Sequence, residues 1–366
     1  MPLLTTVSRF DSAPPADVPV VTVDESFVPP RWLRNSHAQT VFPSNPVRAA
    51  AVREFAGSLL TASREWLLDC GAGVTLQAFE SAAPATADRR DDAPVSVLLH
   101  GWEGSADSLY VLSLAATLHG LGHTIVRLNL RDHGVTHHLN EELFHSCRLA
   151  EVVGAVKQIT ARYPRRQLNL IGFSLGGNFM LRVGADAPNH GVDIARIVAI
   201  SPVLDPDRTM TALESGLWVY DRYFIDKWSR SLRIKSHAWP HLYDFEAILR
   251  GKSLRTMTEE LVRAHTEYTA LPDYLAGYAI TGSRLARLAA PATIVTALDD
   301  PILPAADLER LAASPLLDII ATRYGGHCGF LQSLGPKTWI DGLVPGLVSS
   351  TPAVSGIDPV PLLQRS

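Results

Sequence analysis

The stretch that most constrains the fold runs from Leu168 to Met180 and reads Leu-Asn-Leu-Ile-Gly-Phe-Ser-Leu-Gly-Gly-Asn-Phe-Met. A short apolar run leads into Gly172-Phe-Ser174-Leu-Gly176, and a segment able to form a helix follows. This is typical of a nucleophile elbow, in which the serine holds a strained backbone conformation on a sharp turn between strand and helix. Small residues two positions on either side let the strand and the helix approach each other. The stretch predicts that Ser174 Oγ stands at the carboxyl end of a strand, beside the first amides of a helix.

Short apolar segments alternate with helical ones on both sides of this elbow. Strands are expected over residues 94–100, 124–130, 168–173, 194–200, 292–297 and 317–324, and helices over 108–118, 147–163, 307–312 and 339–347. Segments 64–70 and 74–79 are expected to pair as an antiparallel hairpin. Such alternation predicts an α/β fold, a mostly parallel, doubly wound sheet with helices on both faces and right-handed crossovers.

The alternation is interrupted between residues 203 and 290. Apolar residues recur there at helical spacing, which predicts an amphipathic helix: Leu213, Leu217, Tyr220, Phe224, Trp228 and Leu232. We expect residues 27–202 and 291–348 to form the core and residues 203–290 to form an inserted helical cap over the carboxyl edge of the sheet. Most aromatic residues of the cap are expected to fill its own interior, and a few to line an apolar acyl pocket.

The two ends of the chain are expected to be loose. Residues 1–26 are rich in Pro, Ser and Thr and predict an arm, and residues 349–366 predict a frayed tail. Prolines between residues 27 and 46 exclude a long helix. This segment is expected to wrap an apolar surface, and its large apolar side chains to be buried: Trp32, Leu33, Val41 and Phe42.

Two carboxylates and a histidine follow the last predicted strands. The strand over 292–297 is followed by Leu-Asp299-Asp300-Pro-Ile-Leu-Pro, where the acid of a catalytic triad is expected. Asp300 fits the acid turn better, and Asp299 stays open as the alternative because two adjacent carboxylates differ only in geometry. The next strand ends in Gly-Gly-His327-Cys-Gly, whose glycines allow the loop to turn back toward Ser174. The order Ser174, Asp300, His327 is the one expected for this fold.

The first parallel strand is followed by His100-Gly-Trp102-Glu-Gly. In this arrangement one oxyanion amide comes from that loop and the other from the residue after the nucleophile. The backbone N–H groups of Trp102 and Leu175 are therefore the expected oxyanion donors, each contributing on the order of 3 kcal/mol to transition-state stabilisation. His100 is expected to support the loop.

A second constellation contains Arg131-Asp132-His133-Gly-Val-Thr-His137-His138, with His145 further on. Several histidines and a carboxylate in one loop raise the possibility of a metal site. The spacing matches no paired metal-binding motif, so we expect no metal, and Asp132 and His133 are expected to orient neighbouring loops.

Composition restricts the function classes further. The 366 residues carry a formal charge of −4, with a pI near 6.3, which gives no electrostatic basis for nucleic-acid binding. The odd number of cysteines (three, widely separated) favours reduced thiols and a cytoplasmic setting. The start shows no signal-peptide pattern, and no apolar stretch is long enough to span a membrane. The oligomeric state stays open.

Residues 27 to 345 resemble the α/β-hydrolase superfamily, and within it the YheT-type branch, which also includes eukaryotic medium-chain acyl-ester esterases and ethanol acyltransferases. The resemblance rests on Trp32-Leu-Arg-Asn-Ser-His37-Ala-Gln-Thr40, His100-Gly101, Gly-Phe-Ser174-Leu-Gly-Gly-Asn178, Asp299-Asp300-Pro301 and Gly-Gly-His327-Cys-Gly-Phe. The first of these, the entry segment, is the most specific to the branch. In one departure, Arg131-Asp132-His133-Gly134 stands where the branch usually carries a Gly-rich Arg-Gly loop.

The resemblance implies hydrolysis of a small-molecule carboxylic ester with a short- or medium-chain acyl group, and it implies no cofactor. Together with the motifs it predicts a serine hydrolase that acts through an acyl-enzyme intermediate. An acyltransferase, in which an alcohol replaces water, is an open alternative. A metal-dependent hydrolase using the histidines of residues 132–145 is a weaker one.

Overall fold

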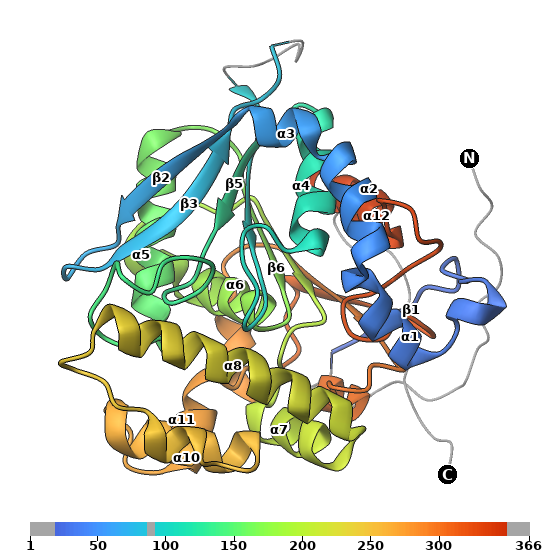
Figure 1. The fold of residues 1–366 in the computed structure, drawn as a ribbon. Coiled ribbons are helices and arrows are strands. Elements are labelled where there is room, and N and C mark those ends of the chain that lie inside the picture. The colour runs from blue at the N-terminus through green and yellow to red at the C-terminus, as the bar shows by residue number, and fades with distance from the viewer. Residues whose placement is uncertain (1–18, 86–91, 350–366) are drawn as a thin grey trace.

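The computed structural model describes residues 19–85 and 92–349, which form one nine-stranded sheet (Figure 1). Its order is β1-β9-β8-β7-β6-β4-β5-β3-β2. β2 pairs antiparallel with β3, and β3 pairs antiparallel with β5, whereas every other described pair is parallel. The fold is thus the predicted α/β class. The strands are β1 (Val21–Val23), β2 (Ser63–Asp69), β3 (Thr75–Ser81), β4 (Val95–Leu99), β5 (Thr124–Leu128), β6 (Leu168–Phe173), β7 (Arg196–Ile200), β8 (Ala292–Ala297) and β9 (Leu317–Thr322).

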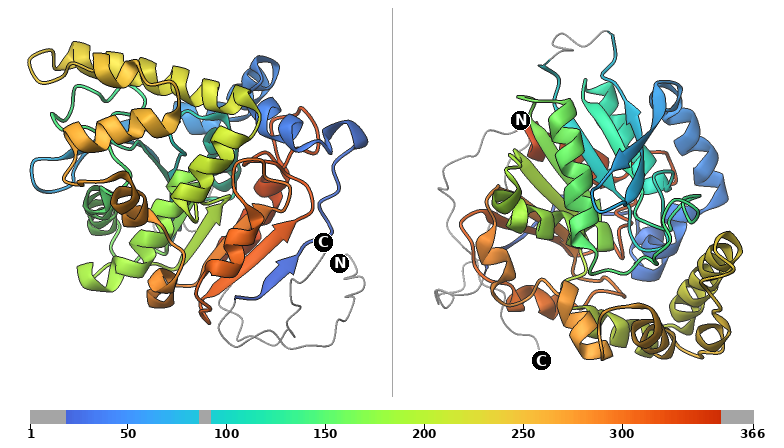
Figure 2. Two further views of the ribbon diagram at one scale, coloured as in Figure 1. Left: turned by 90° about the horizontal axis from the view of Figure 1, so that it is seen from below. Right: turned by 90° about the vertical axis from the view of Figure 1, so that its left-hand side faces the viewer.

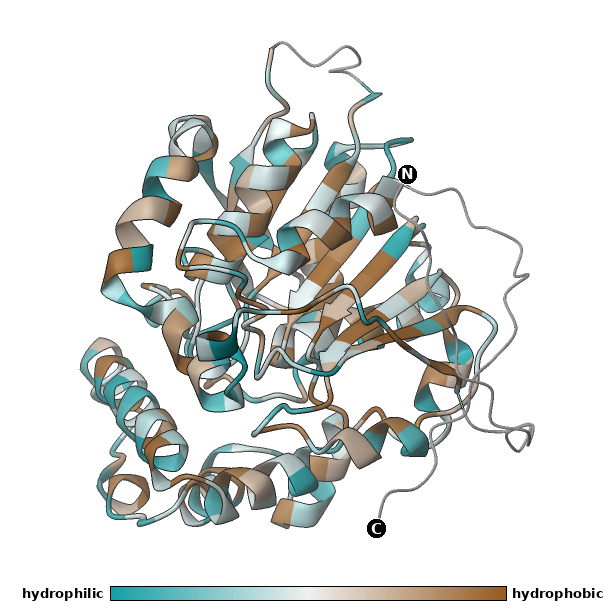
Figure 3. Cartoon of the chain, turned by 90° about the vertical axis from the view of Figure 1, so that its right-hand side faces the viewer, coloured by the Kyte–Doolittle hydropathy of each residue, from teal (hydrophilic) through white to brown (hydrophobic). Residues whose placement is uncertain are grey.

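The five central strands are buried along their whole length because helices cover both faces of the sheet. Their composition explains this, since they are rich in Val, Ile and Leu, and Figure 3 shows hydrophobic segments running through the sheet. The parallel register pairs Leu99 with Gly172 and Phe173 with Ile200. The carboxyl ends of β4, β6 and β7 therefore meet at one edge, where the loops that follow them converge.

Helices form a layer on each face of the sheet (Figures 1 and 2). On one face, α4 (Leu109–Gly120) and α12 (Trp339–Ser349) pack against the strands, with α2 (Pro46–Phe55) and α3 (Gly57–Thr61) against α4. On the other face lie α5 (Leu149–Arg162) and α6 (Leu175–Asp186).

A block of helices lies between β7 and β8, in the lower part of Figure 1, and its apolar side chains form clusters that also include side chains of the core. It contacts the loops after β4 and β5, at the carboxyl edge of the sheet. Its elements are α7 (Pro206–Ser215), α8 (Trp218–Ala238), α9 (Glu246–Leu249), α10 (Leu254–His265), α11 (Leu271–Tyr278) and a 3₁₀ turn (Ser283–Arg287).

The helix predicted from the apolar spacing of residues 213–232 is in fact two helices. Chain direction changes at Gly216, whose backbone is extended and where an added Cβ would lie 2.7 Å from the Ala212 carbonyl oxygen. Leu213 therefore belongs to α7, and Leu217 precedes α8 with 44% of its surface exposed. Helical spacing alone did not reveal this break.

The N-terminal region differs from expectation in two ways, in the strand β1 and in the exposure of two large side chains. Val21–Val23, inside the expected arm, forms the edge strand β1 beside β9. The entry segment folds as a 3₁₀ turn (Arg31–Leu33), α1 (Ser36–Val41) and a second 3₁₀ turn (Phe42–Ser44). Leu33 is buried as expected, but the predicted burial of Trp32 and Val41 is wrong, because more than half of each side chain is exposed. Residues 1–18 and 350–366 lie outside the described residues.

Near the C-terminus, one predicted helix has a different form. Residues expected as a helix over 307–312 form a 3₁₀ turn, Ala305–Arg310, instead. It follows Pro304 directly and ends before Leu311, which is extended. The segment is thus too short for a stable α-helix, and 3₁₀ geometry is common in pieces of this length.

Candidate active site

Ser174 stands between the last residue of β6 and the first of α6, with a φ of 51° that non-glycine residues rarely adopt. The two flanking glycines are required sterically. A Cβ on Gly172 would lie 2.3 Å from the Gly176 carbonyl oxygen, and one on Gly176 would lie 2.4 Å from the His100 oxygen. The strained turn thus rests on close backbone packing, as the elbow pattern predicts.

Ser174, His327 and Asp300 form one hydrogen-bonded chain. His327 Nε2 lies 2.9 Å from Ser174 Oγ, and Nδ1 lies 2.9 Å from Asp300 Oδ2. The other carboxylate oxygen of Asp300 accepts the backbone N–H groups of Ile302 and Leu303, which fixes its orientation. The Asp300 side chain is fully buried, and that of His327 is 12% exposed.

The charge environment of His327 favours its protonated form. Burial by itself lowers the pKa of His327, but the Asp300 carboxylate, through its charge and its hydrogen bond, raises that pKa well above the ordinary value. A histidine held in this way can store the proton taken from a nucleophile, because the neighbouring carboxylate stabilises the imidazolium.

The neighbouring carboxylate, Asp299, has a different contact. Its Oδ1 accepts the backbone N–H of Gly326 at 2.9 Å, on the same loop as His327. Asp300 is therefore the carboxylate that contacts the imidazole, and Asp299 holds the loop backbone.

The two predicted oxyanion donors lie next to Ser174. Leu175 is the first residue of α6, where a backbone N–H has no acceptor within the helix. Trp102 follows Gly101, where an added Cβ would lie only 3.1 Å from Ser174 Cβ. His100 bridges this loop, since Nδ1 lies 2.7 Å from the Gly101 oxygen and Nε2 accepts the Leu130 N–H. Burial lowers the pKa of His100 to about 4, which keeps the ring neutral, and the two hydrogen bonds place its proton on Nδ1.

Comparison with known proteins identifies the family and the fold. The family model described as alpha/beta hydrolase fold matches residues 94–333. The chain belongs to that family. It is also similar over 88% of its length to mouse phospholipase ABHD3, with 23% identity and 77% of that protein covered. It is 24% identical to embryogenesis-associated protein EMB8 of Picea glauca, over 82% of this chain and 66% of that protein.

Among solved structures, 2,6-dihydroxy-pseudo-oxynicotine hydrolase superposes with a TM-score of 0.51. The match covers 87% of the present chain and 77% of the oxynicotine hydrolase at 14% identity, and it supports a shared fold. Of the helices in the described ranges, none combines the length and hydropathy that a membrane span needs.

The helical block contributes aromatic side chains beside the candidate site of the hydrolase. The Trp102 ring stacks on Phe224 at 5.4 Å and meets Trp228 edge-on at the same separation. Both partners come from α8, and the surrounding cluster includes Ile302 and Leu303 of the turn after Asp300. Apolar side chains from the block and the core thus meet next to the triad residues.

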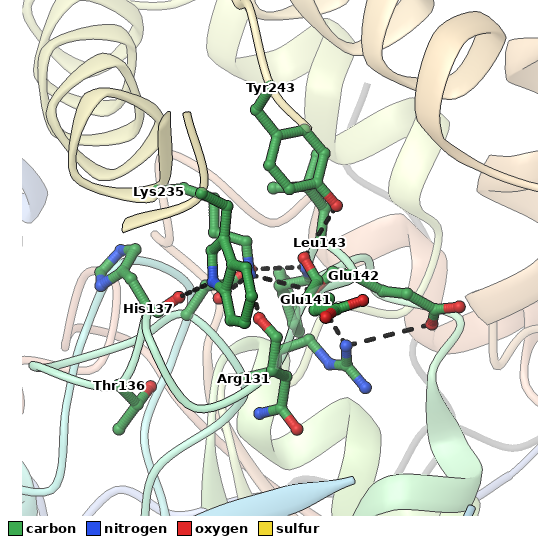
Figure 4. Close-up of polar contacts among 12 residues, drawn as sticks. Arg131, Thr136, His137, Glu141, Glu142, Leu143, Lys235 and Tyr243 are labelled. Atoms are coloured by element: carbon green, nitrogen blue, oxygen red, sulfur yellow. Dashed lines mark hydrogen bonds and ion pairs between the residues drawn. The ribbon is translucent and has the colours of Figure 1, made fainter. Parts of the chain in front are cut away.

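The histidine-rich loop after β5 makes contacts with its own backbone and with α8. Lys235 of α8, 1% exposed, places Nζ 2.9 Å from Asp132 Oδ1 and also donates to the carbonyl oxygens of Asn140 and Glu142 (Figure 4). His133 bonds the Arg131 carbonyl, and His137 bonds Ser231. Sequence reasoning missed Lys235, because a lysine at a helical position normally predicts exposure.

No group of three or more His, Cys, Asp or Glu side chains in the described ranges is arranged to hold a metal ion. A cavity of about 880 Å³ does lie near this loop. Its lining comes from the β2–β3 turn, residues 142–151 and residues 243 and 264–267. None of the three triad residues lines it.

Proposed function

We propose that this protein is a serine hydrolase of carboxylic esters that acts through an acyl-enzyme intermediate. The observation that carries the proposal is the hydrogen-bonded chain of Ser174, His327 and Asp300 on a strained elbow. Nucleophile, base and acid lie within the distances that proton transfer requires.

In the proposed mechanism, Ser174 Oγ attacks the ester carbonyl while His327 Nε2 takes its proton. Asp300 stabilises the imidazolium, and the Trp102 and Leu175 amides bind the oxyanion. The tetrahedral intermediate collapses, the alcohol leaves with the proton of His327, and Ser174 is acylated. Water, deprotonated by His327, then attacks the acyl-enzyme. The acid is released, and Ser174 recovers its proton.

For the substrate we propose short- or medium-chain acyl esters. The aromatic cluster of Trp102, Phe224 and Trp228 supports an apolar acyl chain more readily than a polar one. We also propose that residues 203–290 act as a cap and that the chain belongs to the YheT-type branch, which the entry segment supports. The relative named a phospholipase also favours acyl esters as the substrate class.

An acyltransferase is the second candidate, because the same acyl-enzyme serves both reactions. An alcohol in place of water would yield a new ester, and analysis of products with and without added ethanol distinguishes the two. The weaker metal-dependent alternative would need several ligands together, and in the described ranges no group of three or more His, Cys, Asp or Glu side chains could hold a metal ion.

Replacing the nucleophile tests the proposal. Ser174→Ala should lower the kcat for p-nitrophenyl esters by on the order of 10⁶-fold, because the variant has no hydroxyl to attack the ester carbonyl. Circular dichroism should show an unchanged fold, and a serine-directed phosphonate should label the wild type but not the variant. Undiminished turnover in Ser174→Ala would overturn the proposed function. A series of esters of increasing acyl-chain length then tests the proposed apolar pocket. Equal rates for all chain lengths would contradict such a pocket.

A further inference from the structure

The entry segment carries the most branch-specific motif of the sequence, yet the mechanism above assigns it no role. Its helix α1 lies directly against the loop that carries His327. An added Cβ on Gly326 would lie 2.4 Å from the Ser36 carbonyl oxygen, and one on Gly329 would lie 2.0 Å from the Gln39 carbonyl oxygen. The two backbones are therefore in contact, and glycine is required at both loop positions.

The backbone N–H groups of this loop are held by side chains from several elements. Thr40 Oγ1 accepts the N–H of His327 itself at 3.0 Å, and Gln39 Oε1 accepts that of Leu331 at 2.7 Å. The remaining contacts come from Asp299, which accepts Gly326 N–H at 2.9 Å, and from Ser201, which accepts Cys328 N–H at 3.4 Å. Two of these four acceptors belong to α1.

Both α1 side chains are themselves fixed. Thr40 Oγ1 donates to the Ser36 carbonyl oxygen at 2.8 Å, so its lone pairs point toward the loop. Gln39 is fully buried, and its amide nitrogen donates to the carbonyl oxygens of Leu33 and Leu331. These hydrogen bonds leave each side chain a single orientation, which is what an element that positions another group requires.

The same short helix also contacts the helical block. His37 Nδ1 lies 2.8 Å from the hydroxyl of Tyr220 near the start of α8, and Tyr220 is 5% exposed. Thus α1 connects α8 on one side with the His327 loop on the other.

We propose that Thr40 and Gln39 are positioning residues for His327: they set the backbone of its loop so that Nε2 meets Ser174 and Nδ1 meets Asp300 at the same time. This rests on the proposed function of the triad. The loop over residues 325–331 carries three glycines and four residues with positive φ, so many conformations are accessible to it and its catalytic geometry needs external support. Holding the N–H of His327 itself is the most direct support.

Thr40 offers the sharper test, because Thr40→Val keeps the shape and removes the acceptor. We expect kcat for p-nitrophenyl esters to fall about 10–100-fold with KM nearly unchanged, as for a small misplacement of a catalytic group. The second-order rate of phosphonate labelling of Ser174 should fall in parallel. Thr40→Ser keeps the hydroxyl and should restore both rates to within a few-fold of wild type.

Thr160→Val is the matched control. The Thr160 hydroxyl donates to the carbonyl four residues earlier in α5, as that of Thr40 does in α1, but it contacts no catalytic loop. This variant should keep wild-type kcat and labelling rate. Thr40→Ala provides a second acceptor-free variant if thermal unfolding shows that Thr40→Val is not folded.

Three outcomes separate the hypotheses. Wild-type kcat and labelling in folded Thr40→Val or Thr40→Ala would overturn the positioning role, while an inactive Ser174→Ala would leave the proposed function standing. Equal losses in Thr40→Val and Thr40→Ser would also overturn it, because the hydroxyl would then not be the group that matters. Activity retained in Ser174→Ala would instead remove the proposed function on which the inference rests.

Discussion

Two loops at the carboxyl edge of the sheet have similar residues and different roles. The loop over residues 325–331 presents His327 to Ser174 and Asp300. The loop over residues 131–145 also combines an aspartate with histidines, but Asp132 pairs with Lys235, and its histidines lie against backbone and side-chain groups. The fully buried carboxylate in contact with the imidazole is the difference. It raises the pKa of His327, whereas burial without such a partner lowers the pKa of His133 and His137.

The contrast shows that residue type alone does not identify a catalytic histidine. The partner of the imidazole and the position of its loop decide whether a histidine can act in catalysis. Both depend on which strand end the loop follows. Three experiments test this difference between the loops, beginning with the one for which we expect the largest effect.

The first experiment removes the carboxylate from the imidazole. Asp300→Asn should lower kcat by about 10⁴-fold, because an amide neither stabilises the imidazolium nor selects the correct tautomer. Activity requires neutral His327, so kcat/KM of the wild type should rise with pH as that group loses its proton. Without the Asp300 charge its pKa falls, so the residual activity of the variant should reach its plateau at lower pH.

Asp299→Asn is the control for this change. An asparagine Oδ1 can still accept the Gly326 N–H, so kcat should stay within about tenfold of wild type, well above that of Asp300→Asn. Steady-state kinetics across pH on both variants provides the measurement. A larger loss in Asp299→Asn would reverse the assignment of the acid.

The second experiment breaks the ion pair of the other loop. Burial raises the pKa of Asp132 and lowers that of Lys235, so each depends on the other to stay charged. Lys235→Met leaves Asp132 buried without its cation and should lower the free energy of unfolding by about 3–5 kcal/mol. Urea denaturation measures this loss. Adding Asp132→Asn to that variant should recover part of it.

Arg222→Met on the same helix is the matched control for Lys235→Met. Arg222 pairs with Asp226 at 3.0 Å on the surface, with both side chains more than half exposed. Removing an exposed pair of this kind should cost less than about 0.5 kcal/mol. Similar losses in the two variants would mean that burial does not set the strength of the Asp132–Lys235 contact.

Much of the fold could be predicted from sequence because the informative signals are local. The buried strands are short apolar runs, and Ser174, Asp300 and His327 each follow one of them in the expected order. Adjacent carboxylates could not be separated, since only the tertiary position of His327 distinguishes Asp300 from Asp299. The break at Gly216 was missed because helical spacing continues across it.

Other contacts leave no local signal. Thr40 and His327 are 287 positions apart, and Asp132 and Lys235 are 103 apart. Nothing in either neighbourhood indicates the partner, because a lysine on a helix and a threonine in a polar segment normally face water. The proline-rich entry segment excluded a long helix but gave no sign that a short one would contact the catalytic loop.

The third experiment compares the two loops through the pH dependence of stability. Burial lowers the pKa of His145 to about 3, whereas an unfolded histidine titrates near 6.5. The unfolded state therefore binds more protons between these values, and His145 makes folding less favourable as pH falls from 6.5 toward 3. His327 has the opposite sign. Its raised folded pKa stabilises the fold below pH 6.5, and this contribution is lost as pH rises through the folded pKa.

Replacing each histidine should therefore change the pH profile in opposite directions. In urea unfolding between pH 4 and 8, His145→Gln should flatten the acid-side loss of stability by about 1–3 kcal/mol. His327→Gln should instead act above pH 6.5, where it removes the loss of stability with rising pH that the protonated His327 contributes. Equal changes of slope in both variants would contradict the inferred difference between the buried Asp300 beside His327 and the exposed Glu267 beside His145.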